Sequence, residues 1–143
     1  MTSVAKAHHT AICTRDVEGS LRFWRDGLGF EVTMDQRFEG GWRELFDAPD
    51  DVLRSVFLGD PSDQSSGIVE LVDLGDVRSA DPPAGPGVGF FLVSVYLDVD
   101  AALLRLADLG LGGTPRRITV HGVSMAVVRD PNGVRVELIG LPG

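Results

Sequence analysis

The chain of 143 residues contains a single cysteine, Cys13, and only ten aromatic residues. One cysteine cannot close an intramolecular disulfide. A chain of this length buries roughly 70% of its unfolded surface, so it needs no disulfide or metal ion in order to fold. The length predicts one domain, or two halves that share one core.

Long apolar segments are also missing. The longest apolar run extends from Val88 to Leu97, is interrupted by Gly89 and Ser94, and is far shorter than the ~20 residues of a membrane helix. The first nine residues, Met-Thr-Ser-Val-Ala-Lys-Ala-His-His, contain no apolar signal core. We therefore expect a cytoplasmic, soluble protein with no membrane partner.

Basic residues are few, since 13 lysines and arginines stand against 21 acidic residues and the net charge is -8. Nucleic-acid binding depends on basic side chains that neutralise phosphates. No stretch of the chain concentrates such residues, and Arg116-Arg117 is only a pair. A nucleic-acid partner and an anionic membrane surface are therefore not expected.

What the chain does have is an internal repeat, a feature that decides fold class. In each copy a strand is followed by an aspartate that can cap a helix, an apolar stripe at helical spacing, and a glycine suited to a left-handed helix end. In chain order these residues are His9, Asp16, Val17, Leu21, Trp24, Leu28 and Gly29 in the first copy, and Phe91, Asp98, Val99, Leu103, Leu106, Leu109 and Gly110 in the second.

Three strands are expected after each helix. They are residues 30–34, 53–58 and 68–74 in the first copy, and about 116–120, 124–129 and 134–139 in the second. Residues 37–51 read as a loop, and Asp-Pro-Asn-Gly at 130–133 is a strong turn signal. The prediction is an α+β fold in one domain (1–143), with two βαβββ modules at about 5–77 and 88–143 and a Pro/Gly linker at about 78–87.

Several motifs give the chain a family resemblance. They are His9 with Asp16, Phe-Trp-Arg-Asp-Gly-Leu-Gly-Phe at 23–30, Ile-Val-Glu-Leu at 68–71, and Asp-Pro-Asn-Gly-Val-Arg-Val-Glu-Leu at 130–138. With these motifs the sequence resembles the vicinal-oxygen-chelate superfamily, which includes glyoxalase I, extradiol dioxygenases and bleomycin resistance proteins. The resemblance implies two cupped sheets that form an open, barrel-like sheet around a site for a small molecule, and it implies a homodimer.

The resemblance also implies a set of metal ligands, one from the first and one from the last strand of each module. In this chain the set would be His9, Glu70 and Glu137. The fourth position, found by counting back seven residues from Asp98, holds Phe91, whose ring cannot donate an electron pair to a metal. This departure disfavours an extradiol dioxygenase, whose ligands are two histidines and one carboxylate.

The two glutamates can also be weighed without the resemblance. Glu70 and Glu137 each lie between apolar residues of a strand, and burying an unpaired charge is costly. A metal ion or an arginine beside the two carboxylates would offset the cost of burying them. The alternative is that they face solvent or pair with Arg135 or Arg43. His121 is expected in a loop, where it could replace a missing ligand, and Cys13 is expected as a small buried filler.

Two functions follow. In the first, His9, Glu70 and Glu137 hold Mn, Fe, Ni, Co or Zn, and a carboxylate, Glu137 or Glu70, acts as general base in a lyase, isomerase or epimerase. In the second there is no metal, and the protein binds a small molecule as bleomycin resistance proteins do. The expected pocket residues are Phe91, Val93, Cys13 and Met125, and the sequence does not identify the substrate or ligand.

Overall fold

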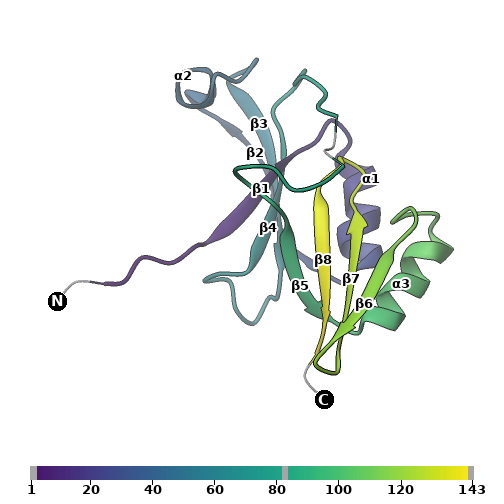
Figure 1. Cartoon of the computed structure of the whole chain (residues 1–143). Coiled ribbons are helices and arrows are strands. Elements are labelled where there is room, and N and C mark those ends of the chain that lie inside the picture. Colours follow the sequence, from purple (N-terminus) through teal and green to yellow (C-terminus); the bar gives the residue numbers. More distant parts are fainter. Residues whose placement is uncertain (1–2, 82–83, 142–143) are drawn as a thin grey trace. The chain divides into compact units, whose positions relative to one another are not determined.

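The computed structural model describes residues 3–81 and 84–141, and its strands form two four-stranded sheets (Figure 1). Internal contacts divide the chain into two units. The first unit contains the segment up to Val17 together with Phe30–Val77, and the second contains Glu18–Gly29 together with the chain from Arg78 onward. Two positions of the expected linker, 82 and 83, lie outside the described residues.

The first unit contains the sheet β1-β4-β3-β2, with β1 at His9–Cys13, β4 at Ile68–Asp73, β3 at Val52–Gly59 and β2 at Glu31–Glu39. β1 and β4 are parallel, and the other neighbours are antiparallel. Residues that alternate along a strand share a face, and the register Ala11↔Glu70↔Phe57 therefore places these three side chains on one face of the sheet.

The second unit repeats this topology in the sheet β5-β8-β7-β6, with β5 at Val93–Leu97, β8 at Arg135–Gly140, β7 at Val123–Arg129 and β6 at Arg116–Val120. Again the first pair is parallel and the others are antiparallel. The expected α+β fold with two βαβββ modules is thereby confirmed.

Both long helical segments pack together in the second unit. α1 (Val17–Leu21) continues as a π-helical segment, η1 (Arg22–Gly27), which contacts α3 (Val99–Asp108). A Cβ at Gly27 would lie 2.5 Å from the Leu106 side chain, so glycine permits this close approach. Arg105 Nε also donates to the Gly27 carbonyl at 2.9 Å. The helix of the first sequence repeat therefore belongs to the core of the second unit.

The expected helix cap at Asp98 is present, since its carboxylate accepts a hydrogen bond from the Ala101 N–H at 3.1 Å. The expected loop at 37–51 is wrong in part. β2 continues through Glu39, paired with Val52, and a short helix, α2, spans Trp42–Phe46. A five-residue helix completes too few turns to leave a periodic signal in the sequence.

No helix in the described parts of the chain is long and apolar enough to cross a bilayer.

A buried hydrogen-bond network centred on Asp130 joins α1 and η1 to the turn between β7 and β8. Asp130 Oδ2 accepts from Trp24 Nε1 and from Asn132 Nδ2, both at 3.1 Å. Its Oδ1 accepts from the backbone N–H groups of Asn132 at 2.9 Å and Val134 at 2.8 Å. Asn132 Nδ2 in turn reaches Ser20 Oγ at 3.0 Å. The turn that the sequence marks therefore also serves as the docking point of the first helix.

We predict that Asp130→Ala lowers the free energy of unfolding by about 3 kcal/mol, because it leaves the buried Trp24 N–H and two turn N–H groups without their acceptor. Urea denaturation followed by circular dichroism measures this loss. Asp108→Ala, at the exposed end of α3, is the matched control and should change stability by less than about 0.5 kcal/mol. Equal stabilities of the two variants would contradict the role given to Asp130.

Candidate functional site

A cavity of about 660 Å³ lies within the first unit, on the face of the sheet that carries Glu70. Its wall is mostly apolar or aromatic, and it contains no lysine or arginine. The lining residues are His9, Ala11, Cys13, Met34, Phe38, Trp42, Phe46, Leu53, Ser55, Phe57, Glu70, Val72 and Leu74. A concave, apolar wall with a few convergent polar groups is the usual composition of a small-molecule site.

The polar groups in this wall form one hydrogen-bonded array. His9 Nε2 lies 3.3 Å from Glu70 Oε1, and Ser55 Oγ donates to Glu70 Oε2 at 2.5 Å. The Glu70 side chain is 15% exposed and that of His9 is 35% exposed, so the carboxylate is the more enclosed partner. The predicted neighbours His9 and Glu70 therefore meet, and Ser55 is an additional member.

The His9 ring is held from two further sides. Its Nδ1 lies 2.9 Å from Nδ1 of His8, and one of these two nitrogens must carry the shared proton. The Phe57 ring lies against it, with ring centroids 5.2 Å apart. Because Glu70, His8 and Phe57 fix three sides of the imidazole, the ring orientation is set before any ligand enters.

Cys13 lies on the same face and lines the same cavity. Its side chain is open to the cavity rather than buried as a filler, but the cavity wall removes part of the water around the thiol. This desolvation is the main cause that raises the pKa of Cys13, and the negative charge of Glu70 raises it further. The thiol is therefore not activated as a nucleophile.

Glu137 lies in the second unit, on β8, where its Oε1 accepts a hydrogen bond from Ser94 Oγ at 2.9 Å. Of the expected pocket residues, Met125 pairs with Ile139 and so shares the face of Glu137. Val93 pairs with the buried Val136 and lies on the alternate face of β5. The cavity of the first unit thus contains Cys13 from the expected pocket set, while the other three belong to the second unit.

The strand register changes the interpretation of Phe91. In the first sheet Glu70 pairs with Ala11, and His9 lies two positions before that partner. In the second sheet Glu137 pairs with Ser94, and the residue two positions earlier is Leu92. Counting back from Asp98 selects Phe91 because the connection from strand to helix is shorter in the second module, one residue against three. Neither leucine nor phenylalanine can bind a metal.

The donor groups within each unit can be tested against the needs of a divalent ion. In the described parts of the chain no group of three or more histidine, cysteine, aspartate or glutamate side chains could hold a metal ion. In the first unit Glu70 already has protein partners at both oxygens. Neither unit by itself presents a donor set that fits a metal, and the ligand set of His9, Glu70 and Glu137, which draws on both units, stays a prediction.

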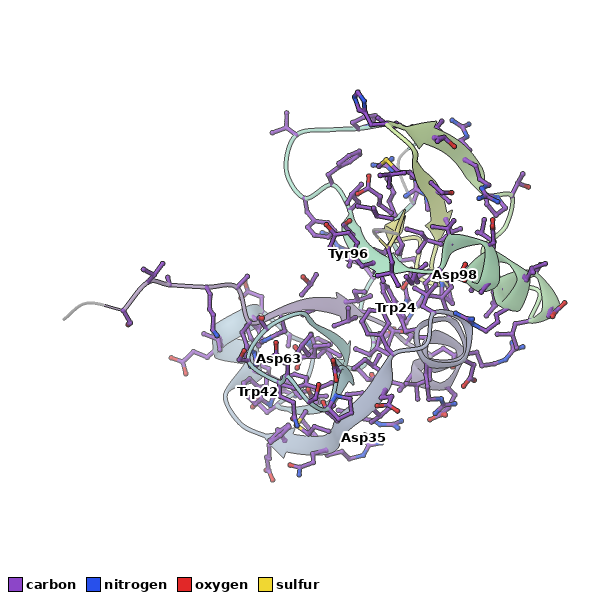
Figure 2. All side chains as sticks on the ribbon, turned by 90° about the horizontal axis from the view of Figure 1, so that it is seen from below. Trp24, Asp35, Trp42, Asp63, Tyr96 and Asp98 are labelled. Carbon is purple, nitrogen blue, oxygen red and sulfur yellow. The ribbon has the colours of Figure 1, made fainter. Side chains whose placement is uncertain are left out.

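Sequence reasoning misses the aromatic side of the cavity. Trp42, which is labelled in Figure 2, and Phe46 both come from α2. Their rings stack with an interplanar angle of 9° and centroids 5.9 Å apart. Trp42 Nε1 donates to the Phe38 carbonyl at 3.0 Å, which fixes the indole ring beside the cavity. The only signal for this wall is the presence of three aromatic residues in a segment that otherwise resembles a loop.

Comparison with known proteins gives a consistent result. A family model described as Glyoxalase/Bleomycin resistance protein/Dioxygenase superfamily matches residues 6–138. The chain is 35% identical to the lactoylglutathione lyase-like protein terB of Aspergillus terreus, over 94% of this chain and 75% of that protein.

Solved structures show the same fold at lower identity. A glyoxalase family protein from Bacillus cereus has a TM-score of 0.76 at 16% identity, covering 99% of this chain and 97% of that chain. TnmS3, an antibiotic binding protein from Streptomyces sp. CB03234, has a TM-score of 0.65 at 19% identity, covering 99% and 100% of the two chains.

We predict that the rate at which iodoacetamide alkylates Cys13 rises with pH and reaches half its maximum above the usual thiol pKa of about 8.5. The reason is that burial and the charge of Glu70 both disfavour the thiolate. Glu70→Gln should move the midpoint down only part of the way, since desolvation is the larger cause. Ser55→Ala keeps the charge of Glu70 and serves as the control. Mass spectrometry of the alkylated protein gives the rates, and an unshifted midpoint in the wild type would count against this environment.

Proposed function

The chain belongs to the Glyoxalase/Bleomycin resistance protein/Dioxygenase superfamily, and we propose that it is an acid–base enzyme of that family which isomerises a small, largely apolar carbonyl compound in the cavity of the first unit. The observation that carries the proposal is the position of Glu70 between His9 and Ser55 in an otherwise apolar wall.

The cavity favours a neutral substrate with a flat apolar part. Its volume of about 660 Å³ is within the range of drug-sized ligands. Trp42, Phe46 and Phe57 present ring surfaces, and the wall has no lysine or arginine to receive a carboxylate or phosphate. A substrate carbonyl would gain polar contact only at the His9–Glu70–Ser55 array.

Proton transfer by Glu70 is the chemistry that this array supports. Glu70 takes a proton from the carbon next to the carbonyl, and the carbon–hydrogen electron pair moves into the enolate. If a carbon–carbon double bond stands next to that carbon, the enolate extends over it, and the carboxylic acid returns the proton to the far end of the conjugated system. A β,γ-unsaturated carbonyl compound thereby becomes its α,β-unsaturated isomer, and no atom or electron is gained or lost. Ser55 holds Oε2 at 2.5 Å, and His9 lies farther from Oε1, at 3.3 Å, so Oε1 is the less tightly held oxygen and acts as the base.

Binding without chemistry is the second candidate. It is supported by the predominance of apolar and aromatic side chains in the cavity wall and by the fold shared with an antibiotic binding protein. In that case Glu70 and Ser55 would act only as hydrogen-bond partners of the bound molecule. The two candidates differ in whether Glu70 exchanges a proton with carbon.

Acetophenone in heavy water is a suitable probe, because exchange of its methyl hydrogens for deuterium needs only a base and a bound enolate. We predict that the protein accelerates this exchange, followed by proton NMR. Glu70→Gln should slow the accelerated rate by about 100-fold or more, whereas Ser55→Ala, which only loosens the carboxylate, should cost about tenfold.

Ala11→Phe, which fills the cavity, is the control for location and should remove the acceleration while the fold is retained. Quenching of Trp42 fluorescence by acetophenone reports binding separately. Quenching without any exchange would overturn the enzyme proposal and favour the binding protein, and the absence of both would overturn both.

We further predict no turnover of the hemithioacetal of methylglyoxal and glutathione, measured by its ultraviolet absorbance. Glutathione carries two carboxylates, and the cavity offers no lysine or arginine to pair with them. Turnover at a rate typical of enzymes, about 1 per second or faster, would show that the substrate class is wrong.

A further inference from the structure

The second unit contains a separate pocket of about 200 Å³ at the start of β8 and the end of β7. We propose that this pocket binds the oxyanion, carboxylate or phosphate, of a small molecule that also carries a flat apolar group. It is lined by Gly87, Val88, Phe90, Phe91, Arg129, Gly133 and Arg135. The two charged residues in this lining are both arginines, although the whole chain has a net charge of -8.

Arg135 is the central residue of the pocket. Only 9% of it is exposed, and in the described parts of the chain no carboxylate lies within ion-pair distance of its guanidinium. Its contact is with Phe91, whose ring centroid lies 4.7 Å from Cζ. Arginine remains charged inside proteins. Among the described residues no fully enclosed side-chain nitrogen or oxygen lacks a hydrogen-bond partner, so the guanidinium nitrogens of Arg135 are accessible from the pocket. A cation–π contact replaces part of the lost hydration and leaves the N–H donors without an anionic partner.

Arg129 adds a second positive charge at the same place. It is the direct cross-strand partner of Arg135 in the β7–β8 ladder, and both residues line the pocket. Like charges directly opposite each other destabilise a pair of strands. Arg129 Nη1 donates to the Gly133 carbonyl at 3.0 Å, which holds the side chain along the turn instead of letting it swing into solvent. A bound oxyanion would accept hydrogen bonds from the Arg135 guanidinium and would lie beside the second positive charge of Arg129.

The remaining lining defines the rest of the ligand. Phe91 stacks on Arg135, and Phe90 and Val88 are exposed, so an apolar group attached to the anion would meet hydrocarbon beside the charge. A volume of about 200 Å³ admits a small acid or the charged end of a longer molecule. This site shares no lining residue with the cavity of the first unit and does not depend on the function proposed for that cavity.

Calorimetric titration at low ionic strength with sodium benzoate, inorganic phosphate and benzyl alcohol tests the proposal. We expect saturable millimolar binding of benzoate, of phosphate or of both, and much weaker binding of benzyl alcohol, which has the ring without the charge. Binding of benzoate alone would assign the site to carboxylates, and binding of phosphate alone would assign it to phosphates. Absence of binding by both anions, or benzyl alcohol binding as tightly as benzoate, would overturn the proposal.

Variants locate the binding. Arg135→Gln and, in case that variant does not fold, Arg129→Gln should each weaken anion binding by about tenfold or more. Arg116→Gln makes the same charge change on β6, outside the pocket, and should leave the affinity within about twofold, as should Ala11→Phe in the other unit. The rise in melting temperature with anion concentration should disappear in the same two arginine variants. Equal affinity in Arg129→Gln, Arg116→Gln and the wild type would overturn the assignment.

Discussion

The parallel register of β1 and β4 is the constraint on which the candidate site depends. Because side chains alternate between the faces of a strand, the pairing of Ala11 with Glu70 decides that His9, Cys13 and Glu70 all face the cavity. A slip of one residue would turn His9 away and bring Thr10 and Ile12 to that face. The register between β1 and β4 therefore brings the His9 imidazole and the Glu70 carboxylate within contact distance.

The second unit shows how far the same topology can diverge when one connection is shorter. Its sheet has the same order and the same mixture of parallel and antiparallel pairs. Yet Glu137 has Ser94 rather than alanine opposite it, and arginines occupy the end of the β7–β8 ladder. One half of the molecule therefore presents a mostly apolar cavity with one carboxylate, and the other presents two arginine side chains in a small pocket.

Most of the fold could be predicted from the sequence, because the repeat, the helical stripes and the Asp130–Gly133 turn are local signals. The meeting of His9 and Glu70 was implied by the family resemblance. Ser55 and Trp42 could not be found in this way, since a serine in an apolar strand and a tryptophan in an apparent loop acquire meaning only through pairing with distant residues. Counting back from Asp98 selects Phe91, whereas the strand register selects Leu92, because counting along the chain assumes that the connections in the two modules are equally long.

The hydrogen bond between Trp24 and Asp130 joins residues that are 106 positions apart. During translation the helix that carries Trp24 is synthesised early, and the turn at Asp130–Gly133, to which Trp24 binds, is synthesised almost last. During most of translation the aromatic residues of that helix have no partner from the second unit, so they are exposed to chaperones and to other nascent chains. A fragment cut at the linker would likewise separate the helix from the sheet it stabilises. The two sequence repeats are therefore not two modules that can fold independently, one after the other.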